Sequence, residues 1–159
     1  MLGFQALRPG EVANLRKEDV DIDRGILILT DTKSQETQYS PIHQDLLSPL
    51  KNYVKHLKQD EYLFIRSSKK PWDRKDIYRA VQQIGDVFGV KDINPRKLRS
   101  TVAHHMIAIG VPMNVISEVL RHKDKATAPR HYTQITDIEI VRHAMNSVRF
   151  NTQADSTEE

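Results

Sequence analysis

The sequence has no cysteine, a single tryptophan and no long apolar run. The absence of cysteine excludes disulfide bonds and thiolate ligands for zinc. No segment approaches the roughly 20 consecutive apolar residues of a membrane-spanning helix, and none resembles a secretory leader. We therefore expect a soluble, cytoplasmic protein with no membrane partner.

Basic residues outnumber acidic ones more than the net charge of +3 suggests. Residues 151–159 hold three acidic and no basic side chains, which leaves 24 basic and 18 acidic residues, a net charge of +6, on residues 1–150. A basic body favours a polyanionic partner such as DNA, although charge by itself does not identify one.

The composition is that of one folded domain. With 38% hydrophobic and 28% charged residues in 159 positions, the chain is long enough to bury a core. No repeat or interdomain linker is evident, so we assign residues 1–150 to one domain and residues 151–159 to a disordered acidic tail. Residues 1–7 run directly into Arg8-Pro9-Gly10, and we expect further sequence to precede them in the natural protein.

Apolar spacing and capping residues predict a mostly helical domain. Pro9 suits a first helical turn, which places Arg8 at the mouth of a helix. Asn94 is expected to cap a helix that starts at Pro95 and stops near Gly110. Apolar stripes predict further helices over residues 47–57, 77–88, 112–120 and 138–148.

A small antiparallel sheet is expected in the first half of the chain. Ile26–Leu29 is predicted as a buried strand after a turn at Asp21–Gly25, and Tyr39–Ile42 as its hairpin partner, with Lys33 near the end of the hairpin. Tyr62–Ile65 is predicted as a third strand. The predicted fold class is α+β, mostly α-helical, with a small three-stranded antiparallel sheet.

The last third of the chain concentrates basic residues ahead of one tyrosine. Guanidinium groups donate paired hydrogen bonds to phosphate oxygens and stay protonated, and a nearby tyrosine can act as a nucleophile. A short helix starting near Thr127 should carry the tyrosine. The three runs are Arg96-Lys97-Leu98-Arg99, Leu120-Arg121-His122 and Arg130-His131-Tyr132.

Five motifs, taken in chain order, resemble the catalytic domain of the tyrosine recombinases, the phage-integrase family. They are Ala6-Leu7-Arg8-Pro9-Gly10-Glu11, Lys33 in the hairpin, Arg96-x-x-Arg99, Leu120-Arg121-His122 and Tyr132. The resemblance covers nearly the whole chain and implies the DNA breaking-rejoining enzyme fold. It also implies a site-specific recombinase in which Tyr132 attacks a DNA phosphate, forms a covalent 3′-phosphotyrosyl link and releases a 5′-hydroxyl. The implied partners are double-stranded DNA and other copies of the chain, as a tetramer on DNA, with no metal, nucleotide cofactor or small-molecule substrate. The catalytic residues it implies are Arg8, Lys33, Arg96, Arg99, His122 and Tyr132.

The resemblance also assigns roles to these residues. Arg8 and Arg99 would hold the non-bridging phosphate oxygens, and Lys33 would protonate the leaving 5′-oxygen. His122 would contact the phosphate or assist proton transfer near Tyr132. Each residue also has a structural alternative: a surface charge at a helix start for Arg8, a stem that covers apolar surface for Arg99, a solvated turn lysine for Lys33, a helix-end cap for His122 and a half-buried tyrosine with a satisfied hydroxyl for Tyr132.

Two positions depart from the family pattern. Arg96 stands where the family usually has histidine or lysine; it can donate to a phosphate but cannot accept a proton. Arg121 stands where the family commonly has glycine, so it should cost energy if that position needs a positive φ. These departures predict either slower chemistry or an inactive relative. We also predict DNA contacts from Arg121, Lys123, Lys125 and Arg130.

Three other hypotheses remain open at this point. A DNA-binding module without chemistry would use Gly110–Lys125 as a turn and recognition helix. A metal enzyme would need a cluster drawn from His104, His105, His122 and His131, although adjacent histidines on a helix point about 100° apart. The apolar stripe of the last helix, at Ile138, Val141, Met145 and Val148, could pack on its own core or on a neighbouring protomer.

Overall fold

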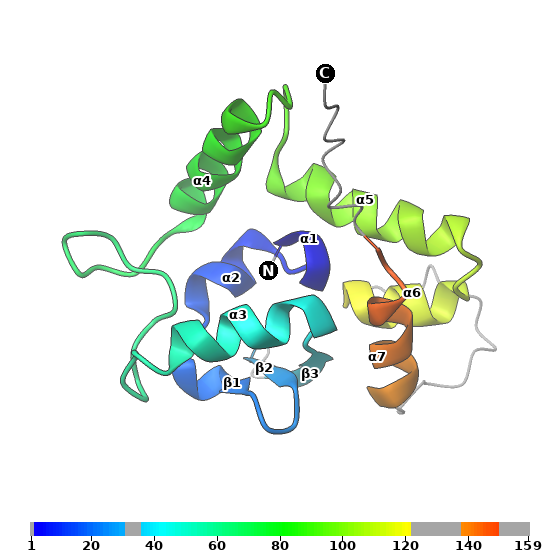
Figure 1. The fold of residues 1–159 in the computed structure, drawn as a ribbon, viewed down its shortest axis with the longest axis horizontal. Coiled ribbons are helices and arrows are strands. Elements are labelled where there is room, and N and C mark those ends of the chain that lie inside the picture. Colours follow the sequence, from blue (N-terminus) through cyan, green and yellow to red (C-terminus); the bar gives the residue numbers. More distant parts are fainter. Residues whose placement is uncertain (1, 31–35, 122–137, 150–159) are drawn as a thin grey trace, which may run out of the picture.

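A computed structural model describes residues 2–30, 36–121 and 138–149 of the chain (Figure 1). Helices α1 (Leu2–Gln5) and α2 (Pro9–Asn14) lead into a short 3-10 helix, η1 (Lys17–Asp19). The strands that follow are β1 (Val20–Asp21), β2 (Ile26–Thr30) and β3 (Thr37–Pro41). The remaining helices are α3 (Gln44–Val54), α4 (Arg74–Val87), α5 (Pro95–Ala108), α6 (Met113–Leu120) and α7 (Ile138–Asn146).

The three strands form an antiparallel sheet in the order β1-β2-β3, which confirms the predicted fold class. Ile28 pairs with Tyr39 across the hairpin, and Leu27 pairs with Val20 on the other side. Residues 31–35, which include Lys33, join β2 to β3 and lie outside the described residues.

The predicted third strand, Tyr62–Ile65, is wrong. Tyr62 and Ile65 form only isolated bridges, to Arg16 and Pro71, and the third strand of the sheet is β1. Leu63 is fully buried and its N–H donates to the Leu15 carbonyl oxygen over 2.8 Å. This segment therefore packs on the core as irregular chain, because Leu63 bonds to the α2–η1 connection and Phe64 to Trp72 instead of to the sheet.

The helix boundaries follow the capping residues that the sequence displays. The Asn94 side chain accepts a hydrogen bond from the Lys97 N–H over 3.0 Å, and Pro95 is the first residue of α5. Gly110 follows the end of α5 with φ of 79°, a left-handed conformation that glycine adopts at little cost. The helix predicted over residues 77–88 is confirmed as α4, but its last apolar residues are not core, since Phe88 is 75% exposed.

Two hydrophobic clusters form the core, and the connection between α1 and α2 runs between them. Leu7 belongs to the cluster built around the sheet, α2, α3 and the start of α4. Ala6, the preceding residue, belongs to the cluster built by α5, α6 and α7. In Figure 1, α1 and α2 accordingly lie centrally, between α4 on one side and α6 and α7 on the other. Arg8, the next residue, therefore lies where the two hydrophobic clusters meet.

The last described helix, α7, packs on its own core. Met145 and Val148 are buried against α5 and α6, and α7 also contacts β3. The His43 ring, itself fully buried, lies 3.0 Å through its Nε2 from the Val148 carbonyl oxygen. Within the described parts of the chain, this favours the intramolecular alternative for Met145 and Val148. None of the helices in these parts is long and apolar enough to cross a membrane.

Candidate functional site

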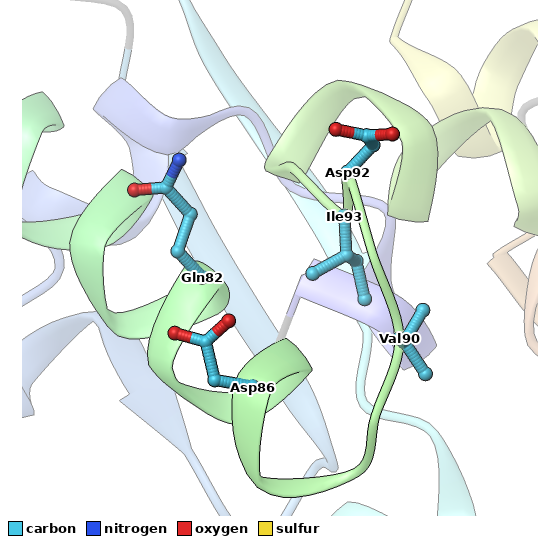
Figure 2. A pocket seen from close by; sticks show the side chains of 5 residues that line it. All are labelled: Gln82, Asp86, Val90, Asp92 and Ile93. Atoms are coloured by element: carbon cyan, nitrogen blue, oxygen red, sulfur yellow. The ribbon is translucent and has the colours of Figure 1, made fainter.

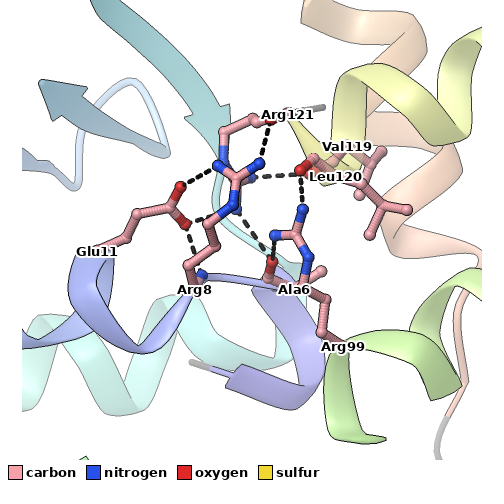
Figure 3. Close-up of polar contacts among 7 residues, drawn as sticks. All are labelled: Ala6, Arg8, Glu11, Arg99, Val119, Leu120 and Arg121. Carbon is pink, nitrogen blue, oxygen red and sulfur yellow. Dashed lines mark hydrogen bonds and ion pairs between the residues drawn. The ribbon is translucent and has the colours of Figure 1, made fainter. Parts of the chain in front are cut away.

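Three guanidinium groups from distant parts of the sequence meet at the C-terminal end of α6 (Figure 3). Arg121, the residue after α6, donates from Nη1 to the Val119 carbonyl oxygen over 2.8 Å. Arg99, one turn into α5, donates to the Leu120 carbonyl oxygen. Arg8, just before α2, donates from Nη2 to the Arg121 carbonyl oxygen over 2.5 Å. The last carbonyls of a helix lack intrahelical partners and carry the negative end of its dipole, so cations bind there favourably.

The main chain at Ala6 supplies a further acceptor to this cluster. Ala6 is fully buried and has φ of 47°, a left-handed conformation that costs a non-glycine residue about 1 kcal/mol. Its carbonyl oxygen accepts hydrogen bonds from Arg99 and, over 3.0 Å, from Nη2 of Arg121. The α1–α2 connection thus links two of the three arginines.

Glu11 supplies a carboxylate to this cluster, although the sequence analysis assigned it no role. Its Oε2 accepts from the main-chain N–H of Arg8 over 2.6 Å and from Nη2 of Arg121 over 3.0 Å, and its Oε1 accepts from Nη1 of Arg8 over 2.9 Å. The signal was present, because an acidic residue three positions after a helix N-cap is typical of a capping box. Three guanidinium groups lie around this one carboxylate, so these four side chains carry a net charge of +2.

The electrostatics of the cluster shift several pKa values. Burial alone would raise the pKa of Glu11, but the Arg121 charge and the Arg8 main-chain N–H outweigh it, so the pKa is lowered. Burial, together with the neighbouring charges of Arg121 and Arg8, lowers the pKa of Arg99 to about 10. Burial also lowers the pKa of Arg121. With a pKa of about 10, Arg99 still carries its charge at neutral pH, and an incoming anion would relieve the repulsion between the guanidinium groups.

The structure does not bring every predicted residue into this cluster. Arg96 is exposed on α5 and makes no side-chain hydrogen bond within the described part of the chain, although Arg99 follows it by three positions. Arg121 was predicted to contact DNA, yet its side chain is only 5% exposed and turns inward to Glu11. Its Nε is buried without a hydrogen-bond partner among the described residues. The other predicted site residues, Lys33, His122, Lys123, Lys125, Arg130 and Tyr132, lie outside the described residues.

Little in the described residues favours a metal site. His104 is exposed and its Nδ1 lies 2.8 Å from the Ser100 carbonyl oxygen one turn earlier, as in an ordinary helix-surface contact. Residues 2–30, 36–121 and 138–149 contain no group of three metal-ligating side chains. Figure 2 shows a hollow between the end of α4 and the turn before α5, whose lining includes the carboxylates of Asp86 and Asp92. None of its lining residues belongs to the arginine cluster.

Comparison with known proteins identifies the family. The model of the phage integrase family matches residues 3–139. The chain belongs to the phage integrase family. It is 33% identical over 134 residues to the tyrosine recombinase XerA of Pyrococcus furiosus, an alignment that covers 82% of this chain and 46% of that protein. The chain therefore spans about half the length of this curated relative.

Solved structures of the family share the fold. An integrase from mycobacterium phage Brujita superposes with a TM-score of 0.75 at 19% identity, over 98% of this chain and 52% of that one. The Tn1549 transposon integrase, in complex with a circular intermediate DNA, gives a TM-score of 0.68 at 14% identity, over 92% of this chain and 56% of that one. At these identities the likeness establishes the arrangement of the helices and sheet around the arginine cluster, whereas the chemistry depends on the residues themselves.

Proposed function

We propose that the chain is the catalytic part of a site-specific DNA recombinase that cuts and rejoins strands through a covalent phosphotyrosyl intermediate. The observation that carries the proposal is the cluster of Arg8, Arg99 and Arg121 around the end of α6, in which Glu11 is the one carboxylate and binds Arg8 and Arg121. Such a cluster suits a phosphodiester, whose non-bridging oxygens accept paired hydrogen bonds from guanidinium donors. The named activity of XerA and the DNA bound to the Tn1549 integrase agree with this choice.

The proposed reaction exchanges one phosphodiester for another. The Tyr132 hydroxyl oxygen attacks phosphorus and forms a P–O bond, its proton passes to His122 or water, and the bond from phosphorus to the 5′-oxygen breaks. Lys33 donates a proton to that oxygen, which leaves as a 5′-hydroxyl. Attack by the 5′-hydroxyl of a second strand reverses these steps and releases Tyr132. The number of phosphoester bonds is conserved, so the reaction needs no nucleotide to supply energy, and the charge stabilisation is assigned to the arginines.

Arg8 and Arg99 would stabilise the charge that builds on the non-bridging oxygens during the displacement. Arg8 is held by Glu11 and by the Arg121 carbonyl oxygen, and Arg99 by the carbonyl oxygens of Ala6 and Leu120, before any ligand arrives, so little reorganisation is required. Preorganised donors of this kind contribute about 3 kcal/mol each to transition-state stabilisation. Arg96 would add charge without acting as a base, because its guanidinium has no lone pair to accept a proton.

The partners are proposed on the same basis. Duplex DNA is the proposed substrate, and the reacting unit is proposed to be a tetramer on DNA, because strand exchange between two duplexes cuts four strands. Residues 1–150 are proposed as the catalytic domain, with residues 151–159 as a tail outside it. Phosphate contacts dominate such binding, so it should weaken steeply with salt.

A capture assay on duplexes of random sequence tests the proposal and selects the target site at the same time. The chain is incubated with a library of such nicked duplexes and denatured, and the DNA that remains attached to protein is sequenced. We expect adducts enriched in one sequence, lost in Tyr132→Phe and kept in the control Tyr78→Phe, which removes an exposed hydroxyl from α4. Retention of DNA before denaturation, with no adduct afterwards, would overturn the catalytic proposal in favour of a DNA-binding relative without chemistry.

A further inference from the structure

We infer that Arg121, which replaces the family's usual glycine, is a positioning residue that keeps Arg8 and Arg99 directed toward the reacting phosphate. The inference rests on the proposed function. It concerns the side chain of Arg121, which is turned inward and buried, so the residue acts through its neighbours.

The backbone of Arg121 shows that its side chain offsets a conformational cost. Its φ and ψ of 50° and 50° lie in the left-handed region, where a non-glycine residue costs about 1 kcal/mol and glycine is the ordinary occupant after a helix. A residue persists in such a conformation when surrounding contacts stabilise it. Here these contacts are the hydrogen bonds of its guanidinium to Val119, Ala6 and Glu11.

Arg121 shares an acceptor with each of the two catalytic arginines. The Ala6 carbonyl oxygen accepts from both Arg121 and Arg99, and the Glu11 carboxylate accepts from both Arg121 and Arg8. Its own carbonyl oxygen accepts from Arg8 as well. Without its side chain, Glu11 would be left to Arg8 alone and the Ala6 carbonyl to Arg99 alone. Both guanidinium groups would then lose the neighbour that limits how they donate to these acceptors, and their orientation toward a phosphate would be less restricted.

The electrostatic balance points the same way. Arg121 is the strongest of the influences that keep the pKa of the buried Glu11 low. Removing the Arg121 charge leaves the effect of burial opposed by Arg8 alone, so Glu11 would take up a proton at a higher pH than in the wild type. A protonated Glu11 holds Arg8 less firmly, which connects the position of Arg8 to pH.

Three substitutions at this position separate the side chain from the backbone. Arg121→Gly and Arg121→Ala both remove the guanidinium, but only glycine also relieves the left-handed backbone. Arg121→Lys keeps the charge without the planar fork. The rate of adduct formation on the captured nicked duplex is measured for each over a range of pH, with a carbon-13 titration of the Glu11 carboxyl and a melting curve.

We expect the glycine and alanine variants to form adduct about a hundredfold more slowly, the order of effect of misplacing a reacting group by about 1 Å. The acid limb of their rate profiles should move to higher pH together with the Glu11 titration, and Arg121→Lys should keep that limb near its wild-type position. A shift in melting temperature with an unchanged acid limb would overturn the inference, since it would show a purely structural role. Absence of adduct in the wild type would overturn the proposed function as well, and the Glu11 titration would show separately whether Arg121 controls that carboxyl.

Discussion

Replacing Glu11 with glutamine is the sharpest test of the charge balance in the arginine cluster. The substitution keeps the size of the side chain but exchanges one acceptor oxygen for an NH₂ donor. The carboxylate now accepts from three donors over 2.6, 2.9 and 3.0 Å, two of them on Arg8 and one on Arg121. With one oxygen left, at least one of these donors must face the new NH₂ group.

The magnitude follows from the hydrogen bonds that are lost. A hydrogen bond to a charged group contributes about 1.5–3 kcal/mol, and the Glu11 side chain is 20% exposed, so solvent screens it little. We expect Glu11→Gln to lower the free energy of unfolding by about 2–3 kcal/mol at neutral pH. For a chain of this length that corresponds to about 5–10 °C in Tm. Urea unfolding followed by circular dichroism measures the difference.

The pH dependence gives this prediction a second, independent part. The pKa of Glu11 in the folded chain lies below its ordinary 4.5, so the carboxylate stabilises the fold above pH 4.5. That contribution is lost as the pH falls below 4.5 and through the folded pKa, and wild type and variant should then converge. The control is Glu36→Gln, which removes an exposed carboxylate and should change stability by less than about 0.5 kcal/mol. Equal effects of the two substitutions at neutral pH, or a difference that persists in acid, would refute the reasoning.

Three further predictions concern packing and DNA binding. Gly85→Ala should destabilise the chain by about 2 kcal/mol in urea unfolding, because the new methyl group would overlap the Ile93 side chain, and this outweighs the better helix propensity of alanine. The control Gly3→Ala should not destabilise the chain, because the space around Gly3 is open. His43→Phe should lower the free energy of unfolding by about 2 kcal/mol and speed hydrogen exchange in α7. It removes the buried hydrogen bond between His43, which precedes α3, and the carbonyl oxygen of Val148, just after α7. Arg96→Ala should reduce the slope of log affinity against log salt by about 0.9 if its exposed guanidinium neutralises one phosphate, and an unchanged slope would remove Arg96 from the DNA surface.

The two departures from the family pattern have different structural consequences. Arg96 is exposed, so we expect the arginine that stands there in place of the family's histidine or lysine to affect the proposed chemistry more than the fold. Arg121 is buried and has a φ of 50°, so the condition under which a side chain at this position was expected to cost energy is met. In the proposed reaction, Arg96 bears on proton transfer, whereas Arg121 bears on how Arg8 and Arg99 are held.

Local sequence determined where the helices begin and end. Asn94 and Pro95 start α5 and Gly110 follows it, because capping and left-handed conformations depend on the residue itself and its nearest neighbours. The β2–β3 hairpin was predictable for a similar reason, since an apolar run followed by a polar turn favours pairing of adjacent strands. The order of the motifs also indicated the family, which the family model then confirmed.

Only the tertiary structure decided which residues meet. It placed β1 in the sheet instead of Tyr62–Ile65. Val20 and Asp21 of β1 pair with β2, whereas the Leu63 N–H bonds to the Leu15 carbonyl oxygen. It also brought Glu11 to Arg121, 110 positions away, and turned that arginine inward. Such contacts depend on how α2, α5 and α6 pack around the Ala6–Arg8 connection, and a pattern of neighbouring residues carries no information about partners that distant. The sequence by itself therefore determined the longer helices, the β2–β3 hairpin and the residue types of the candidate site, whereas packing between the two core clusters decided the third strand and the geometry of the site.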